Sequence, residues 1–266
     1  MQVTVLGKSP SWQDAGGACS GYLVREGETT LLLDCGNGVF SKLRQHVDYV
    51  DVTAVVVSHL HADHTLDLVP FAYALTYAPR QQPVPVPPFW EGTKNPARPE
   101  LHVPAGGRET FRQLTRLWGN ETLVEDAFRL QEYDTDDVLQ IGELVVRFHP
   151  VPHYLPTHAI EVTSSVNGSG RLTYGADCSP TEDLVEFARD TDLLIIEATL
   201  PRPERGGVRG HLTPGEAGDH GRRAKARRVV LTHISDELDH EWARSQAEET
   251  FGGAVEVARE GATYEL

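Results

Sequence analysis

Residues 59–64 read His-Leu-His-Ala-Asp-His, which places three imidazoles and a carboxylate within six positions of the chain. The stretch 52–57 just before them is apolar and rich in valine, a pattern typical of a short buried strand. Four polar side chains beside a buried strand are costly to desolvate unless a partner compensates them, and a divalent cation is a common partner. The spacing therefore predicts a metal site at the end of a strand.

The segment from His59 to His64 resembles the signature of the metallo-β-lactamase superfamily, whose members hold two metals in a four-layer αββα sandwich. This resemblance implies an α/β protein with that fold. It also implies that His59 and His61 bind the first metal, whereas Asp63 and His64 bind the second.

Further matches to this family follow in the expected order along nearly the whole chain. By resemblance, His153 is the third ligand of the first metal, Asp177 bridges both metals, and His233 completes the second site. His149 and His158 flank His153 and compete with it, but the spacing to the next strand favours His153. Such nitrogen and oxygen donors suit two divalent ions, with Zn²⁺ expected and Mn²⁺ or Fe²⁺ as alternatives.

Two later segments, 192–199 and 210–213, resemble a pair of motifs in the ribonuclease Z branch and its small-phosphodiesterase relatives. This resemblance implies that His211 handles the proton of the leaving group and that Glu197 orients His211. Taken alone, each of the two is better explained as an ordinary strand-end or loop residue, and their joint order along the chain favours the catalytic interpretation. Residues 213–216 read as a capping box with a proline in the first turn, so His211 is expected just outside a helix amino terminus.

The elements that must position these residues follow a layered α/β pattern with β-hairpins early in each half. Strands are expected at 2–6, 20–25, 29–34, 52–57, 101–104, 143–148, 158–166, 171–175, 192–197 and 228–232. Helices are expected at 63–78, 107–118, 180–189 and 213–226. Two β-rich halves that meet at the ligand-bearing strand ends would give the four-layer sandwich. No second domain is indicated, so residues 1–266 are expected to form one hydrolase domain.

Composition favours a small substrate. The chain of 266 residues has 24 Lys and Arg against 39 Asp and Glu, a formal net charge of −15. An acidic body repels the phosphates of a nucleic acid, so a nucleic acid is disfavoured as a partner and a small phosphodiester is favoured. Three cysteines without a disulfide spacing, and no apolar span of about 18 residues, indicate a cytoplasmic protein with no membrane partner.

The segment 79–99 interrupts this composition with seven prolines and the adjacent aromatic residues Phe89 and Trp90. A loop of this length is expected to border the metal site or a subunit interface, and a merely solvated excursion is the alternative. A homodimer is compatible with the resemblance, since relatives in this branch are often dimers.

Basic residues form two groups outside the ligand set. Arg202, Arg205 and Arg209 precede His211 and are the better candidates for contact with a phosphate. The group 222–228 reads instead as the solvated, positively charged end of a helix.

The resemblance implies a dinuclear metal-dependent hydrolase, in which a hydroxide between the metals attacks phosphorus while Asp63 accepts a hydrogen bond from it. The favoured function is a phosphodiesterase acting on small phosphodiesters such as cyclic nucleotides. The alternative is a tRNA 3′-processing endoribonuclease, but that enzyme carries an arm between its third and fourth motifs. Only 23 residues separate His153 from Asp177, too few for an arm. Lactone or thioester hydrolysis and a non-catalytic metal-binding module rank lower.

Overall fold

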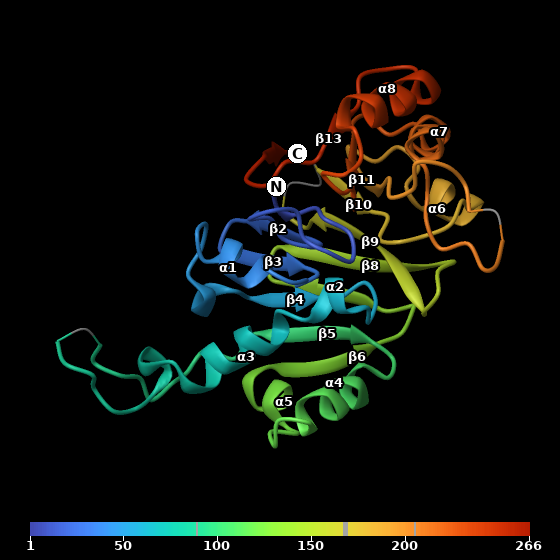
Figure 1. Ribbon diagram of the computed structural model, residues 1–266. Helices are drawn as coiled ribbons and strands as arrows, with labels where there is room; N and C mark the ends of the chain where they lie inside the picture. The colour runs from blue at the N-terminus through green and yellow to red at the C-terminus, as the bar shows by residue number, and fades with distance from the viewer. Residues whose placement is uncertain (89, 167–169, 205) are drawn as a thin grey trace.

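The computed structural model describes residues 1–88, 90–166, 170–204 and 206–266. Its described strands form two seven-stranded sheets, and helices cover the outer face of each sheet (Figure 1). This arrangement confirms the four-layer αββα sandwich expected from the sequence.

The first sheet has the strand order β14-β1-β2-β3-β4-β5-β6. Strands β14 to β3 pair antiparallel in that order, and strands β3 to β6 pair parallel. The strands are β1 (Gln2–Gly7), β2 (Gly21–Glu26), β3 (Thr29–Leu33), β4 (Ala54–Val56), β5 (Glu100–Pro104), β6 (Arg129–Tyr133) and β14 (Thr263–Glu265). Because β3 and β4 are parallel, the loops that follow them leave from the same edge of the sheet.

The second sheet has the strand order β13-β12-β11-β10-β9-β8-β7. Strands β7 to β10 pair antiparallel, whereas β10 to β13 pair parallel. The strands are β7 (Val138–Ile141), β8 (Leu144–Val151), β9 (Thr157–Ser164), β10 (Arg171–Tyr174), β11 (Leu193–Glu197), β12 (Val229–Thr232) and β13 (Glu256–Val257). The parallel strands β10, β11 and β12 again end at a common edge.

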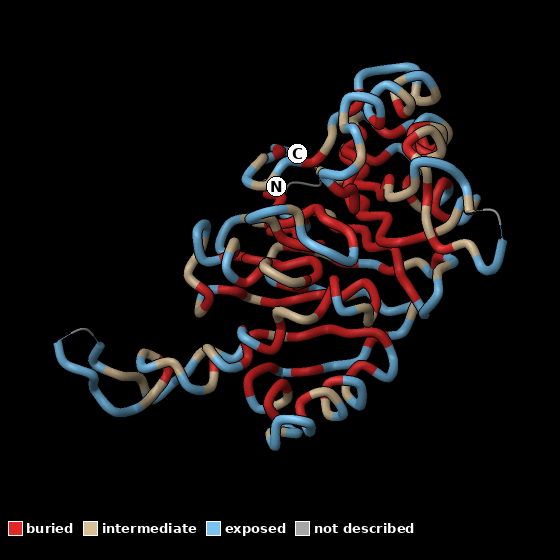
Figure 2. Tube along the Cα trace, viewed as in Figure 1, coloured by how far each residue is buried: buried red, intermediate tan, exposed pale blue. Residues whose placement is uncertain are grey.

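Three apolar clusters fill the spaces between the four layers. Leu31 and Leu33 of β3 pack between the two sheets, whereas Leu32 packs under the outer helices of the first sheet. The third cluster lies between the second sheet and its helices, where Ile196 and Leu231 are buried. Successive residues of a strand point to opposite faces, and both faces are covered here, so these strands read as unbroken apolar runs. Figure 2 shows the buried strands inside exposed outer loops.

The helices divide between the two outer faces according to the apolar cluster that each one joins. The first sheet is covered by α1 (Val39–Leu43), α3 (Leu68–Tyr77), α4 (Gly107–Arg116) and α5 (Leu123–Ala127). The second is covered by α6 (Glu182–Phe187), α7 (Pro214–Ala224) and α8 (His240–Phe251). The short elements are α2 (Ala62–Thr65), η1 (Tyr49–Asp51) and η2 (Pro79–Gln81). Among the described residues, none of these helices has the length and apolar character needed to cross a membrane.

The helix expected over 63–78 is divided into α2 and α3, with a break at Leu66 and Asp67. The carboxylate of Asp67 accepts a hydrogen bond of 2.9 Å from the backbone N–H of Phe40. The backbone N–H of Asp67 donates to the carbonyl of Cys35 at 3.0 Å. These contacts fasten the break to the loop after β3, so α2 is a separate helical turn.

Sequence reasoning missed the edge strands β6, β7, β13 and β14 and the outer helices α1, α5 and α8. Strands β6 and β7 lie at sheet edges, and their exposed positions weaken the apolar pattern. Helix α8 buries only Ala243 and Ala247 fully, which leaves almost no apolar stripe to recognise.

The Pro-rich segment 79–99 begins with η2, and a single isolated bridge joins Val86 to Trp90 among its described residues. The segment projects away from the sheets beyond α3, at the left of Figure 1, and Figure 2 shows it as largely exposed. The expectation that it borders the metal site is therefore wrong for the described residues. The subunit-interface alternative stays a prediction, which deletion of residues 83–96 followed by a measurement of oligomeric state would test. Phe89 lies outside the described residues.

Candidate metal centre

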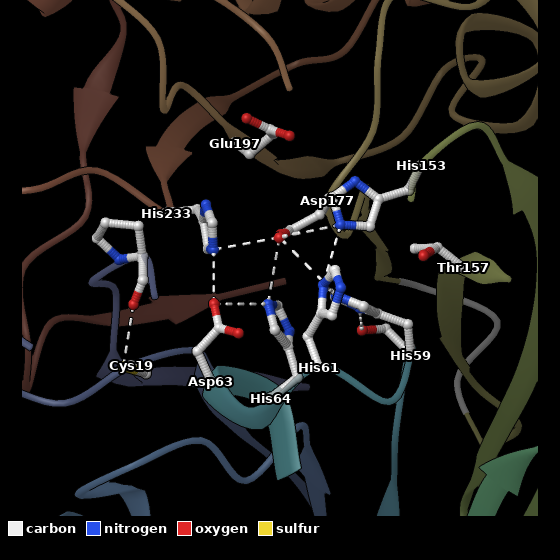
Figure 3. Close-up of polar contacts among 12 residues, drawn as sticks. Cys19, His59, His61, Asp63, His64, His153, Thr157, Asp177, Glu197 and His233 are labelled. Atoms are coloured by element: carbon white, nitrogen blue, oxygen red, sulfur yellow. Dashed lines mark hydrogen bonds and ion pairs between the residues drawn. The ribbon is translucent and has the colours of Figure 1, made fainter. Parts of the chain in front are cut away.

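The structure brings all seven predicted ligands together at the edge where the parallel strands of both sheets end (Figure 3). They are His59 and His61 after β4, Asp63 and His64 in α2, His153 after β8, Asp177 after β10, and His233 after β12. The convergence of distant segments is the geometry that the family resemblance implies. Metal ligation by these side chains stays a prediction.

Three histidine nitrogens form the first cluster. His61 Nδ1 lies 3.1 Å from His59 Nε2 and 3.1 Å from His153 Nε2. A tetrahedral zinc ion with Zn–N bonds of about 2.0–2.1 Å needs its nitrogen ligands roughly 3.3 Å apart. The spacing of the three nitrogens therefore fits one common cation.

Two carboxylates and two histidines form the second cluster. His233 Nε2 lies 3.1 Å from Asp63 Oδ2 and 3.2 Å from Asp177 Oδ2. His64 Nε2 lies 3.5 Å and 3.4 Å from the same two oxygens. Four donor atoms at this spacing, all on buried residues, surround a second point that suits a divalent cation.

Asp177 stands between the two clusters. Its Oδ2 atom lies 3.9 Å from His59 Nε2 and 3.9 Å from His153 Nε2, in addition to its contacts in the second cluster. One oxygen thus faces both sets of donors, which is the position expected of a bridging carboxylate.

Two atoms of this site are buried without a hydrogen-bond partner among the residues that the structure describes, namely His64 Nε2 and Asp177 Oδ1. Buried polar atoms of this kind are rare and need a compensating partner. Burial lowers the pKa of His64, but the charges of Asp177 and Asp34 outweigh burial and raise it well above its ordinary value. The carboxylates therefore attract positive charge to this point, and the donor set fits a divalent cation.

Burial keeps the histidines of the first cluster in the neutral form, which can bind a cation. It lowers the pKa of His59 well below its ordinary value, with repulsion from His64 acting in the same direction. Burial likewise lowers the pKa values of His61 and His153. Neutral imidazoles retain the lone pair that metal coordination requires.

Asp34 is a functional candidate that the sequence reasoning missed. This fully buried residue follows β3, and its carboxylate accepts hydrogen bonds from Ser58 N at 2.7 Å and Tyr174 Oη at 2.9 Å. Its Oδ2 also lies 2.7 Å from His64 Nδ1. A carboxylate on the far nitrogen of a ligand histidine fixes the ring and its tautomer. The signal that could have revealed it is a carboxylate directly after the apolar run 31–33.

Three further predicted ligand histidines, His59, His153 and His233, are also held by a polar contact at the far ring nitrogen. Ser58 Oγ lies 3.1 Å from His59 Nδ1, and the carbonyl oxygen of Gly210 lies 2.8 Å from His153 Nδ1. Thr199 Oγ1 lies 2.7 Å from His233 Nδ1. Each of these contacts leaves the opposite nitrogen free to face the centre of the site.

The backbone at this edge takes a conformation that residues other than glycine seldom adopt. Asp34, Ala176 and His233 have φ values of 57°, 53° and 49°. Each lies within two residues of the end of β3, β10 or β12. The left-handed conformation turns the chain sharply where a site residue is delivered.

The predicted pair His211 and Glu197 lies beside the second cluster. His211 Nδ1 is 2.9 Å from Glu197 Oε1, and Glu197 is fully buried at the end of β11. Burial lowers the pKa of His211, but the hydrogen bond and charge of Glu197 outweigh burial and raise that pKa to about 9. His211 Nδ1 is 4.0 Å from Asp177 Oδ2, so a protonated imidazole is held at the margin of the site.

The histidines that competed with His153 lie elsewhere. The ring of His149 stacks on Phe187 with centroids 5.2 Å apart. His158 is buried, with its Nδ1 atom 3.4 Å from Tyr133 Oη. Neither histidine joins the groups of donors found among the described residues, so the spacing argument for His153 agrees with the structure.

Contact of Arg202, Arg205 or Arg209 with a phosphate stays a prediction, and Arg202 is exposed. Arg209 forms an ion pair with Glu216, and Arg205 lies outside the described residues. Four of the five basic residues in the 222–228 group are paired with carboxylates, as in the contact between Arg223 and Glu182. The interpretation of 222–228 as a solvated helix end therefore agrees with the structure.

Several known proteins resemble this chain over most or all of its length. The family model "Beta-lactamase superfamily domain" matches residues 29–234. The "Probable metallo-hydrolase YhfI" of Bacillus subtilis (strain 168) is 31% identical over 269 residues, with 100% of each chain covered. The crystal structure of YhfI has a TM-score of 0.84 at 28% identity and covers 99% of each chain.

Other relatives are named for action on RNA. A "Ribonuclease Z" of Myxococcus xanthus (strain DK1622) is 29% identical over 306 residues, covering 100% of this chain and 98% of the relative. The crystal structure of human tRNase Z, short form, has a TM-score of 0.73 at 21% identity, covering 100% and 99% of the two chains. At that identity, the structural likeness concerns the fold alone.

Proposed function

The chain belongs to the metallo-β-lactamase superfamily of hydrolases, and from that premise we propose that it is a dinuclear metal-dependent phosphodiesterase. The proposed substrates are small phosphodiesters such as cyclic nucleotides. The observation that carries the proposal is the 2.9 Å contact between His211 and Glu197 beside the donor clusters. A histidine kept protonated next to a cation site is suited to donate a proton to a leaving oxygen.

The two donor clusters would hold the two metals of the proposal. His59, His61 and His153 would hold the first metal, and the second cluster would hold the other, with Asp177 between them. When bound, two divalent cations, with Zn²⁺ expected and Mn²⁺ or Fe²⁺ as alternatives, supply Lewis acidity and lower the pKa of a coordinated water.

Three side chains would then bind the attacking water, supply the proton for the leaving oxygen or orient the proton donor. Asp63 is placed to accept a hydrogen bond from the attacking water, since its carboxylate belongs to the second cluster. Glu197 keeps its carboxylate on His211 Nδ1, which leaves the opposite nitrogen of the ring free to donate. Glu197 is itself held by the backbone N–H groups of Cys178 and Leu212 at 2.9 Å and 3.0 Å. His211 can therefore protonate the leaving alkoxide without changing its own orientation.

We extend the proposal to one hydrolase domain over residues 1–266. Strand β14, from the end of the sequence, pairs with β1 from its beginning, so both ends contribute to the same sheet. The cytoplasmic location expected from the cysteine content stays a prediction.

The second candidate function is tRNA 3′ processing, because relatives named ribonuclease Z match this chain over its whole length. Two observations weigh against it. The formal net charge of −15 repels a folded RNA. The described part of the segment between His153 and Asp177 consists mainly of β9 and β10, which pair directly with each other. Lactone or thioester hydrolysis and a non-catalytic metal-binding module rank lower, since neither explains the paired His211 and Glu197.

The experiment that tests the proposal compares three substrates on metal-loaded protein: bis(p-nitrophenyl) phosphate, cyclic AMP and a precursor tRNA. Metal content is measured by elemental analysis in the same samples. Turnover of the small diesters without specific tRNA cleavage supports the phosphodiesterase. Cleavage of precursor tRNA at a single site, at a much higher kcat/KM than for the small diesters, would favour the second candidate. Protein that is fully loaded with metal but inactive on all three contradicts both.

A further inference from the structure

Tyr154 follows His153 and lies beside both the donor clusters and the proposed proton donor. Its ring centroid is 4.8 Å from that of His153 and 5.9 Å from that of His211. The residue is nevertheless 46% exposed. Part of the ring therefore packs against site residues, while the remainder is exposed to solvent.

A carboxylate holds this ring in place. The Tyr154 hydroxyl donates to Glu204 Oε1 at 2.7 Å, and the backbone N–H of Gly210 donates to Glu204 Oε2 at 3.0 Å. Glu204 thus joins the loop after β8 to the loop that leads into His211. The ring is fixed by a contact at its far end, so it loses little conformational freedom when a ligand binds.

Gly210 permits the close approach of the ring. A Cβ atom at position 210 would lie 2.3 Å from Cε2 and 2.4 Å from Cζ of Tyr154, which is a severe overlap. The carbonyl of the same glycine accepts the hydrogen bond from His153 Nδ1. The position of the ring is therefore built into the segment that also fixes a predicted ligand.

We propose that Tyr154 determines substrate specificity by stacking on a planar aromatic or heteroaromatic substituent of the phosphoester, with the phosphate at the donor clusters. The inference rests on the proposed phosphodiesterase function and narrows its substrate class to nucleoside-like phosphoesters. The ring lies beside His211, the residue proposed to protonate the leaving oxygen. Stacking of a base on an aromatic side chain strengthens binding by about tenfold or more.

Binding of two product-like ligands to the zinc-loaded protein tests the inference without relying on turnover. AMP and ribose 5-phosphate both carry a phosphate on a ribose, but only AMP carries a planar base. We expect the wild-type protein to bind AMP about tenfold more tightly, as measured by isothermal titration calorimetry. Tyr154→Ala should lose most of this preference by weakening AMP alone. Tyr154→Phe, which keeps the ring but loses the contact with Glu204, should retain most of it.

Further variants separate stacking from a structural role. Tyr154→Leu keeps apolar bulk without a planar ring, so it should lose the preference for AMP and provides a second test if Tyr154→Ala does not fold. Tyr77→Ala, which removes an exposed tyrosine on α3, is the matched control and should keep the preference. Metal content and the melting temperature are recorded for each variant.

The outcomes distinguish the two proposals. Equal affinity of the wild-type protein for AMP and ribose 5-phosphate overturns the role of Tyr154 and leaves the phosphodiesterase in place. An undiminished preference in both Tyr154→Ala and Tyr154→Leu does the same. If neither ligand binds and bis(p-nitrophenyl) phosphate is not hydrolysed, the proposed function fails and this inference fails with it.

Discussion

Polar and charged side chains meet both in the metal centre and in the cluster around Glu125. The two clusters differ in whether hydrogen-bond acceptors face donors or face other acceptors. Glu125 of α5 meets the guanidinium groups of Arg108 and Arg112 from α4, so each acceptor faces a donor. In the metal centre, lone-pair-bearing nitrogen and oxygen atoms face one another at 3.1–3.5 Å. The Glu125 cluster is complete without an added ion, whereas the metal centre calls for a cation from outside the chain.

Removal of metal should have the largest effect of the changes considered, on both turnover and the free energy of unfolding. Treatment with EDTA is expected to abolish phosphodiester turnover. Zinc added back at roughly 1,000 times its Kd should raise the free energy of unfolding by about 4 kcal/mol. Calorimetric melting with and without EDTA measures the second effect, and EDTA already saturated with zinc is the control. An unchanged melting temperature in metal-free protein would show that the donor clusters need no cation.

Removal of the proposed proton donor, His211, should have the second-largest effect. His211→Ala is expected to keep its metal content but to lose about 10²- to 10⁴-fold in kcat for a small phosphodiester. The matched control is His46→Ala, which removes an exposed histidine. Steady-state kinetics and elemental analysis on the same samples decide the matter. Unchanged kcat would remove His211 from the proposed reaction.

Loss of the buried carboxylate behind His64 should have a smaller effect. Asp34→Asn keeps the shape of the side chain but removes the charge that faces His64 Nδ1. We expect about a 10- to 100-fold loss of zinc affinity, measured by competition with a chromophoric chelator. The exposed carboxylate of Asp51 supplies the control, since Asp51→Asn should leave zinc affinity unchanged. Equal affinities for the two variants would contradict an orienting role for Asp34.

The Glu125 cluster should give the smallest effect, and one that concerns stability alone. Glu125→Gln is expected to lower the free energy of unfolding by about 0.2–1 kcal/mol at neutral pH, because both arginine partners are well exposed. Metal content should not change. Urea unfolding and elemental analysis test both statements, and a loss of bound metal would break the contrast between the two clusters.

The pH dependence of this stability has a definite sign. The hydrogen bond from Arg112 lowers the pKa of Glu125, and Arg108 acts in the same direction against the effect of burial. Because the folded-state pKa lies below the ordinary value of 4.5, the stabilisation is present above pH 4.5. It is lost as the pH falls through the folded-state pKa. The free energies of unfolding of the wild type and of Glu125→Gln should therefore converge at acidic pH.

Much of the site could be predicted because its information is local. The motif 59–64 follows a valine-rich strand, and β4 indeed ends just before it. The turn 213–216 also forms the predicted capping box, with Thr213 and Glu216 each bonding to the backbone of the other. Short-range rules of this kind act within a few residues, so the sequence displays them directly.

For Asp34, by contrast, the local signal is weak, since it consists only of a carboxylate directly after the apolar run 31–33. Its partners Ser58 and Tyr174 lie far from it in the sequence, and a lone aspartate after a strand is ordinary in a turn. The edge strand β7 and helix α8 were missed because few of their residues are buried. The Pro-rich segment 79–99 projects away from the sheets because of the position of α3 in the fold, and no local sequence pattern predicts that position.

The left-handed turns at Asp34, Ala176 and His233 have a consequence for engineering the protein. Each such conformation costs a residue other than glycine about 1 kcal/mol or more. Valine, isoleucine and threonine tolerate it worst, so a mutant library rich in these residues would lose many members at these three positions for reasons unrelated to chemistry. Asparagine adopts this conformation more readily, which makes His233→Asn a cleaner way to delete that imidazole than substitution by a branched residue.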